Sequence, residues 1–194
     1  MQPLMLASTS VIRAKILRDA GFTVGLVPPG VSEDPGATED PAALATELAI
    51  RKAAAVAAAC PAAWVIGADQ VAHDPLVPGQ WWGKPKDDAD HLARLRAMRG
   101  QRHELCSGWA VIGDGVIQSG VERVSLWGRA DLEEEELAAY VRTREGSGCA
   151  GGYAVEGRGA FLIARVEGDW NTILGLPLFA VVTALRARGW RAGP

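Results

Sequence analysis

Hydrophobic residues open the chain in two patterns, a short unbroken run followed by a run with helical spacing. Residues 3–7 (PLMLA) predict a buried strand, and apolar residues then recur at helical spacing from Ile12 to Ala20. Gly21 is typical of the position just after a helix. We therefore expect a strand, a hydroxyl-rich turn at residues 8–10 (STS) and a helix.

The same two patterns predict the remaining strands and helices. Helices are predicted over 41–59, 87–99, 131–144 (with Asp131 as its N-cap) and 176–190. A strand is predicted over 64–68, hairpins over 108–130 (turning at residues 113–115) and 153–168, and loops over 28–41 and 74–86. Strands interleaved with helices and hairpins predict an α/β fold with a mixed sheet, in one domain over residues 1–194.

Two polar residues stand directly after the apolar run at 64–68 (WVIGA). These are Asp69 and Gln70, and we expect the strand to stop where they begin. In open α/β sheets, ligands bind outside the carboxyl ends of strands. Asp69 is therefore a candidate to bind Mg²⁺ or to orient a water molecule. The alternative is that Asp69 only caps the next turn.

Composition and charge narrow the possible partners. The 194 residues carry a net charge of −3, and the pI is near 5.6. This balance argues against binding along duplex nucleic acid, which needs a basic surplus, but leaves room for a local basic pocket for phosphates. Cys60, Cys106 and Cys149 are widely spaced without a CxxC, so we expect reduced thiols and a cytoplasmic location. No apolar stretch of about 18 residues predicts a membrane span.

Several familiar catalytic motifs are absent or out of context. Residues 146–151 (GSGCAG) match G-x-G-x-x-G, but a predicted helix precedes them and a predicted strand follows, the reverse of a dinucleotide-binding loop. The sequence contains no Walker-type phosphate loop and no G-x-S-x-G. Its histidines, His73, His91 and His103, lack metal-ligand spacing, so we expect them on the surface or in packing rather than in a zinc site.

Ser8, Ser10 and Arg13 lie where the first strand turns into the first helix. Backbone N–H groups at a helix N-terminus attract anions, and an arginine one turn into the helix can hold a phosphate with two parallel hydrogen bonds. These residues are candidates for a phosphate site. The alternative for Ser10 is an ordinary helix cap.

Two lysines and a second acid complete the candidate chemistry. Lys52 stands in the middle of the alanine-rich helix predicted over 41–59, where a solvated lysine is the alternative. Lys84 lies between Gly83 and Pro85, and the restricted backbone there favours a positioned cation. Glu33, from the acidic loop, is a possible second carboxylate beside Asp69. Such a set suits phosphate-ester chemistry with Mg²⁺, which binds through one or two carboxylates plus substrate phosphates.

Several blocks of the sequence resemble one known family. LASTSVIRAKIL (6–17) resembles the L-A-S-x-S-P-x-R-x-x-L-L opening of the Maf-like nucleotide pyrophosphatases. The blocks GVSE, LAIRKA, GADQV and GKP follow in the family's order, and AGGYAVEGRGAFLIARVEGDWNTILGLPL matches its longest block. The resemblance covers almost the whole chain, from about residue 4 to residue 180.

The resemblance implies a fold, a reaction and roles for individual residues. The fold would be Maf/inosine-triphosphatase-like, with helices flanking a twisted mixed sheet and two lobes around a central cleft, often as a homodimer. The reaction would be hydrolysis of a nucleoside triphosphate to the monophosphate and pyrophosphate, with a divalent cation such as Mg²⁺ or Mn²⁺. Asp69 corresponds to the general base, and Asp69 and Glu33 to metal ligands. The phosphate and metal pocket would comprise Ser8, Ser10, Arg13, Glu33, Lys52 and Lys84.

Three positions bear on the base that the resemblance implies. Gln70 and Glu156 match the branch that resembles 7-methyl-GTP pyrophosphatases, whereas Ile12 matches neither that branch nor the branch preferring dTTP and UTP. The two oxygens of Glu156 suit the N1–H and N2–H donors of a guanine edge. Trp81 or Trp82 would give a stacking face for a methylated, positively charged base, with ordinary packing of both rings as the alternative.

We therefore expect a nucleoside triphosphate pyrophosphatase that clears modified nucleotides, with 7-methyl-GTP as substrate. Two alternatives stay open at this point. One is a dTTP/UTP pyrophosphatase, and the other is a nucleotide-binding regulator of cell division with little turnover. All three bind a nucleotide, and none requires duplex nucleic acid or a membrane.

Overall fold

The structure is a computed structural model that describes residues 2–34, 38–77 and 79–191. In these residues seven strands form one mixed sheet, ordered β2-β1-β3-β5-β6-β7, with β4 paired to β3. The strands are β1 (Leu4–Ala7), β2 (Gly25–Leu26), β3 (Trp64–His73), β4 (Trp81–Trp82), β5 (Arg102–Gly113), β6 (Val116–Gly128) and β7 (Ile163–Glu167). The helices are α1 (Val11–Asp19), α2 (Pro41–Ala59), α3 (Asp88–Met98), α4 (Glu134–Thr143), α5 (Trp170–Ile173) and α6 (Leu178–Ala187), with 3₁₀ turns η1 (Glu145–Gly148), η2 (Ala150–Gly152) and η3 (Arg158–Leu162).

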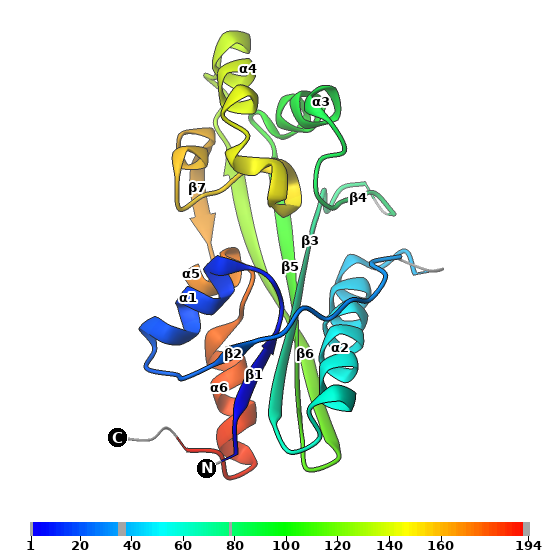
Figure 1. The fold of residues 1–194 in the computed structure, drawn as a ribbon. Coiled ribbons are helices and arrows are strands. Elements are labelled where there is room, and N and C mark those ends of the chain that lie inside the picture. Colours follow the sequence, from blue (N-terminus) through cyan, green and yellow to red (C-terminus); the bar gives the residue numbers. More distant parts are fainter. Residues whose placement is uncertain (1, 35–37, 78, 192–194) are drawn as a thin grey trace.

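The helices cover both faces of the sheet, as Figure 1 shows. On one face α2 packs over β3 and β5, and its small side chains, among them Ala49 and Ala53, are fully buried there. On the other face α1 and α6 enclose a core around Leu6, Leu17 and Leu185. A further apolar cluster lies beneath α3 and α4. The expected mixed α/β architecture with flanking helices is confirmed.

All five predicted helices are present, as α1, α2, α3, α4 and α6. α2 has the predicted bounds because Asp40 caps its first turn and Pro41 occupies the first helical position. α4 begins later than predicted, since its N-cap is Glu133 rather than Asp131. The Glu133 and Glu136 carboxylates form a reciprocal capping box there, whereas Asp131 binds Arg129 instead.

The strand that carries the candidate acid is longer than predicted. β3 continues past residue 68 to His73 because β5 pairs with it antiparallel throughout, as far as the partners His73 and Glu104. The expectation that the strand stops before Asp69 is therefore wrong. Asp69 lies within β3, opposite Gly108 of β5.

One predicted hairpin is confirmed and the other is wrong. β5 and β6 turn at Asp114 and Gly115, both with positive φ, which suits a two-residue hairpin turn. Residues 153–168 do not pair with each other. They form a turn, then η3, and then the single strand β7, which pairs with β6. The short elements β2, β4 and α5 were not expected from the sequence.

Helix α2 contacts the sheet backbone directly at two glycines. A Cβ at Gly67 would lie 2.2 Å from the carbonyl oxygen of Ala49, and one at Gly108 would lie 2.1 Å from that of Ala45. Only glycine fits at either position, because backbone meets backbone with no room for a side chain. This close approach places Lys52 of α2 directly over β3.

One edge of β3 is open over a short stretch. β1 pairs with β3 as far as Gly67, and β4 pairs with it again at Ala72, while β5 occupies the other side throughout. Among the described strands, none therefore pairs with residues 68–71 on the β1 side. This stretch contains Asp69 and Gln70.

The remaining expectations about single residues concern histidines and cysteines. His91 and His103 are buried and contact the Gly152 carbonyl oxygen and the Tyr153 hydroxyl, so both are packing residues as expected. All three cysteines are free thiols. Within the described ranges, no helix combines the length and apolar character needed to cross a bilayer.

Candidate active site

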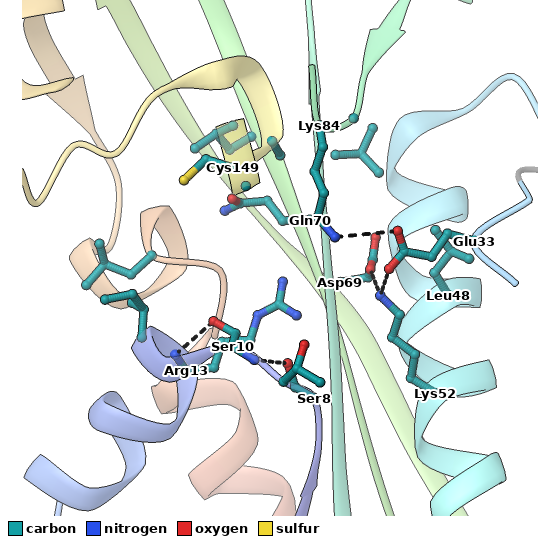
Figure 2. Close-up of a pocket in the computed structure, with 18 of the residues that line it drawn as sticks. Ser8, Ser10, Arg13, Glu33, Leu48, Lys52, Asp69, Gln70, Lys84 and Cys149 are labelled. Carbon is teal, nitrogen blue, oxygen red and sulfur yellow. Dashed lines mark hydrogen bonds and ion pairs between the residues drawn. The ribbon is translucent and has the colours of Figure 1, made fainter. Parts of the chain in front are cut away.

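A pocket of about 350 Å³ opens at the unpaired edge of β3. Its lining includes every residue nominated from the sequence for catalysis, for phosphate or metal binding, or as one of the three positions that bear on the base. These are Ser8, Ser10, Ile12, Arg13, Glu33, Lys52, Asp69, Gln70, Lys84 and Glu156. They come from the β1–α1 turn, α1, the segment before α2, α2 itself, β3, the segment after β4 and the turn before η3, and Figure 2 shows most of them facing one space.

Four charged residues form one side of the pocket, which we call the charged wall: Glu33, Lys52, Asp69 and Lys84. The ammonium group of Lys52 donates hydrogen bonds to Glu33 Oε1 at 2.7 Å and to Asp69 Oδ1. Lys84 Nζ lies 3.7 Å from Glu33 Oε2, so positive and negative groups alternate along the wall (Figure 2). Lys52 is only 6% exposed, which rules out the alternative of a solvated helix lysine.

The environment of Glu33 favours its charged form. The hydrogen bond from Lys52 lowers the pKa of Glu33, and the charges of Lys52, Lys84 and Arg13 lower it further, while burial opposes them. Glu33 is therefore a carboxylate at neutral pH. The charged wall carries two carboxylates beside two ammonium groups.

The side chain of Asp69 has one oxygen occupied and one available. Oδ1 accepts the hydrogen bond from Lys52, whereas Oδ2 has no hydrogen-bond partner among the described residues. The residue is 8% exposed and lines the pocket. The alternative that Asp69 merely caps a turn is wrong, because it lies inside a strand and binds a lysine.

The turn between β1 and α1 presents hydroxyls and a buried guanidinium. Ser10 Oγ accepts a hydrogen bond from the N–H of Arg13 at 3.3 Å, so Ser10 does cap α1, and Ser8 Oγ accepts one from the N–H of Ser10 at 3.1 Å. Arg13 Nε donates to the carbonyl of Gly175 at 2.8 Å and Nη1 to that of Ala68 at 2.7 Å. Two backbone carbonyls thus fix the direction of the guanidinium.

The charge of Arg13 is balanced by the carboxylates across the pocket. Burial lowers the pKa of Arg13, and the negative charges of Asp69 and Glu33 raise it. Arginine stays protonated in proteins because its ordinary pKa is so high. The guanidinium therefore adds a fixed positive charge to the side of the pocket opposite the charged wall.

Gln70 points to the other face of β3 from Asp69, as neighbours in a strand do. Its Nε2 donates to Ser107 Oγ at 2.8 Å and to the carbonyl oxygens of Thr172 and Ile173 at 3.0 and 2.9 Å. Carbonyl oxygens only accept hydrogen bonds, so the amide nitrogen must face them. The atom that Gln70 leaves for a ligand is therefore Oε1, an acceptor.

The other two specificity candidates occupy different surroundings. Ile12 packs against the apolar core beneath α1 and also lines the pocket. Glu156 is exposed and belongs to the turn that Gly157 N–H closes on the carbonyl of Ala154 at 3.1 Å. Glu156 is thus more exposed to solvent than Ile12 or Gln70.

A family model described as Maf-like protein matches residues 3–188 of this sequence. The chain belongs to the Maf-like family. The sequence resemblance to that family is thereby confirmed, and the match covers all of the elements that form the pocket.

The curated relatives that match this chain are named as pyrophosphatases. This Maf-like protein is 43% identical to a dTTP/UTP pyrophosphatase of Deinococcus radiodurans over 95% of this chain and 92% of that one. It is 38% identical to a dTTP/UTP pyrophosphatase of Thermus thermophilus over 97% and 96% of the two chains. A nucleoside triphosphate pyrophosphatase of Nitrobacter winogradskyi is 35% identical over 96% and 94%. The Ham1 protein of Staphylococcus aureus aligns in structure with a TM-score of 0.48 and 18% identity, over 66% of this chain and 72% of that one.

Two polar residues of this Maf-like protein that support the site were not expected from the sequence. Ser107 and Thr172 hold the amide of Gln70, and Ser107 Oγ also donates to the Thr172 carbonyl at 2.8 Å. Thr172 does have a local signal, because Asp169 three residues earlier caps α5 through the Thr172 N–H. Ser107 has none, since only the register of β5 against β3 places it beside Gln70.

The two tryptophans of β4 are packing residues. Both are half-buried, with Trp81 against the apolar cluster around Leu44 and Val71 and Trp82 against the cluster beneath α3. Trp81 also lines the pocket. A stacking role for its ring stays a prediction.

Proposed function

We propose that this chain hydrolyses a nucleoside triphosphate to the nucleoside monophosphate and pyrophosphate. The observation that carries the proposal is the pocket itself. It places the Asp69 carboxylate, with one free oxygen, between the cations of the charged wall and the guanidinium of Arg13. The activities named for the relatives from Deinococcus and Nitrobacter support the same reaction.

The triphosphate would lie between the β1–α1 turn and the charged wall. The N–H groups in the first turn of α1 and the guanidinium of Arg13 suit phosphate oxygens on one side. Lys52 and Lys84 suit them on the other side. Part of the charge of both lysines is balanced by Glu33 when no phosphate is bound.

Asp69 would act as the general base in this arrangement. Its free Oδ2 takes a proton from a water molecule as the water oxygen bonds to the α-phosphorus. The bond from the α-phosphorus to the bridging oxygen breaks, and its electron pair leaves with pyrophosphate. Lys52 holds Oδ1 and so fixes the orientation of the carboxylate. The nearby cations stabilise the charge that develops on the leaving group.

The carboxylates of the pocket suit a divalent cation that takes its other ligands from the substrate. Asp69 and Glu33 both bind the ammonium of Lys52, so their oxygens converge on one region. No group of three or more His, Cys, Asp or Glu side chains among the described residues is arranged for metal binding. Two carboxylates plus phosphate oxygens and water are the ligands that Mg²⁺ commonly takes. Asp69 and Glu33 would hold the cation, which when bound offsets negative charge on the phosphates.

For the base, we propose dTTP and UTP as the substrates, which is the alternative that the sequence left open. The names of the relatives from Deinococcus and Thermus support it. The acceptor atom Oε1 of Gln70 suits the N3–H donor of uracil or thymine. It suits the N1–H of guanine equally well, so Gln70 does not exclude a purine.

The second candidate substrate is 7-methyl-GTP, and Glu156 is the observation that favours it. Its carboxylate lines the pocket and can accept from two donors of a guanine edge. A comparison of Glu156→Gln with the unchanged chain separates the two candidates. If Glu156 reads the base, the ratio of 7-methyl-GTP turnover to UTP turnover falls in the variant. An unchanged ratio would remove Glu156 from base recognition.

Pyrophosphate release from a panel of nucleotides tests the reaction. We expect release with Mg²⁺ or Mn²⁺, and a loss of at least about 10²-fold in kcat for Asp69→Asn, since the amide cannot accept the proton. Asp19→Asn is the matched control, because Asp19 is exposed on α1 and pairs with the exposed Lys15. Nucleotide binding without release by the unchanged chain would favour the regulator of cell division instead.

Other expectations from the sequence stay predictions. These are the single domain over residues 1–194, the two-lobed form around the pocket, the homodimer and the cytoplasmic location. Sedimentation of the purified chain would measure its oligomeric state directly.

A further inference from the structure

Glu145, the first residue of η1, binds the backbone of a separate segment. Its Oε1 accepts a hydrogen bond from the main-chain N–H of Arg158, and its Oε2 accepts one from that of Gly159, both at 3.1 Å. One carboxylate thus holds two consecutive amides at the beginning of η3. Hydrogen bonds to an ionised acceptor are stronger than those between neutral groups.

The surroundings of Glu145 leave its side chain little freedom. A Cβ at Gly157 would lie 2.4 Å from Glu145 Oε1, so a larger residue there would push the carboxylate out of its present position. On its other side, the N–H of Glu145 donates to Thr143 Oγ1 at 3.2 Å. Arg144 takes a left-handed conformation with φ 58°, which turns the chain out of α4 and toward this contact.

The turn over residues 154–157 lies next to these amides and carries Glu156. Its first residue is fixed as well, because the N–H of Ala154 donates to the hydroxyl of Tyr140 at 2.9 Å. The N–H of Gly157 closes the turn on the carbonyl of Ala154. Both ends of the turn are therefore attached to residues in or just after α4. Between them, Val155 and Glu156 line the pocket.

We infer that Glu145 is a positioning residue for substrate selection, which fixes where the 154–157 turn presents Glu156 to the base of a bound nucleotide. Glu145 itself is not part of the pocket lining, so it acts through the backbone of residues 158 and 159. The inference rests on the proposed function, because it assigns Glu145 to the end of the pocket that would hold the base. It does not depend on which base is preferred.

The first test is discrimination among nucleotides that share a triphosphate and differ in base. For Glu145→Gln we expect the spread of kcat/KM over UTP, dTTP, GTP and 7-methyl-GTP to shrink about tenfold, because a turn displaced by a fraction of an ångström no longer fits one base best. A variant that is only less stable contains less active enzyme, which lowers all rates equally and leaves the spread unchanged. An unchanged spread would therefore overturn the inference.

Two further variants make this test specific. Glu135→Gln applies the same chemical change to an exposed carboxylate of α4, and we expect it to keep the full spread. Gly157→Ala places a methyl group against the Glu145 carboxylate, and we expect it to shrink the spread as Glu145→Gln does. A Gly157→Ala variant that keeps the full spread would count against the inference.

Amide hydrogen exchange tests the positioning without any turnover. In the protein without nucleotide, we expect the amides of Arg158 and Gly159 to be protected, and to exchange at least about tenfold faster in Glu145→Gln. Equal exchange in the two proteins would overturn the inference, whatever the rates of pyrophosphate release. If the unchanged chain releases no pyrophosphate at all, the proposed function fails, and exchange alone decides whether Glu145 positions the turn.

Discussion

Asp69 and Gln70 are neighbours in β3, yet they are held in place by different kinds of contact. Asp69 faces α2, where its carboxylate joins the charged wall through the ammonium of Lys52. Gln70 faces the opposite side, where its amide binds two backbone carbonyls and the hydroxyl of Ser107. One strand thus supplies the pocket with a side chain held by charge and a side chain held mainly by backbone carbonyls.

Because their contacts differ, the two sides of the pocket respond differently to pH, salt and the charge of a ligand. Contacts between ions change with pH, salt and the charge of a ligand, because a phosphate can compete for the same lysines. Hydrogen bonds to main-chain carbonyls do not respond in this way, since the carbonyls neither titrate nor move independently of the fold. The charged wall suits binding and chemistry at a triphosphate, and the Gln70 side suits a fixed choice among bases.

Loss of the central ammonium should have the largest effect. In Lys52→Met the side chain keeps its length, but Asp69 loses its orienting donor and the phosphates lose a cation. We expect pyrophosphate release to fall about 10²- to 10³-fold. Lys15→Met, which removes an exposed lysine of α1, should leave the rate unchanged. Full activity of Lys52→Met would mean that the charged wall is structural only.

Displacing α2 should disturb the charged wall and leave the Gln70 contacts in place. In Gly108→Ala the new methyl group meets the carbonyl of Ala45 at 2.1 Å, so the helix must shift. We expect a loss of about 1–3 kcal/mol in the free energy of unfolding, measured by urea denaturation. Gly83→Ala is the matched control, because the nearest atom to its Cβ would be 4.0 Å away. Equal stability of the two variants would contradict this account of how α2 packs.

Removing the amide on the other side should cost stability without any dependence on pH. In Gln70→Leu the carbonyl of Ile173 loses its donor, whereas that of Thr172 keeps Ser107 Oγ and the Gly175 N–H, and we expect a loss of about 1–2 kcal/mol in the free energy of unfolding. The loss should be the same at acid and neutral pH, because no charge is involved. Gln101→Leu, at an exposed position, should cost much less. A loss in Gln70→Leu that depends on pH would contradict the claim that the contacts of Gln70, unlike those of the charged wall, do not respond to pH.

The smallest effect is the pH dependence that Glu33 contributes to stability. The hydrogen bond from Lys52 lowers the pKa of Glu33 from 4.5, so the folded state binds its proton less tightly than the unfolded chain does. This stabilisation is present above pH 4.5 and is lost as the pH falls through the lowered pKa. We expect the difference in unfolding free energy between the unchanged chain and Glu33→Gln to be below about 1 kcal/mol, because the side chain is half-exposed. A difference that grows on acidification would contradict the assignment.

The helices and the first hairpin could be predicted from local sequence because their signals are local. Asp40 and Pro41 mark the start of α2, and Asp114-Gly115 marks a hairpin turn. The end of β3 could not be predicted in this way. Polar residues usually mark the end of a buried strand, but Asp69 and Gln70 find partners on opposite faces of the sheet, and those partners are distant in sequence.

The candidate site shows the same limit. The residues predicted from the family's motifs include ten that line one pocket. No local pattern predicts Ser107, which binds the amide of Gln70, or Glu145, which binds the amide of Arg158. The second hairpin was predicted over residues 153–168, broken by Gly157 and Gly159. In its place the chain forms a turn, η3 and β7, and the Glu145 carboxylate binds the first amides of η3. In both cases the contacts join side chains to parts of the chain that a local pattern does not relate to them.

The close contact of α2 with Gly67 and Gly108 limits where this chain can change in length. One residue inserted between Asp40 and Ala45 would rotate the rest of the helix by about 100°. The lysine would then turn away from β3, and a larger side chain would meet the two glycines. An insertion at the exposed tip of the β5–β6 hairpin, by contrast, changes neither contact. Among related chains, we expect length differences to collect at such tips and to avoid this half of α2.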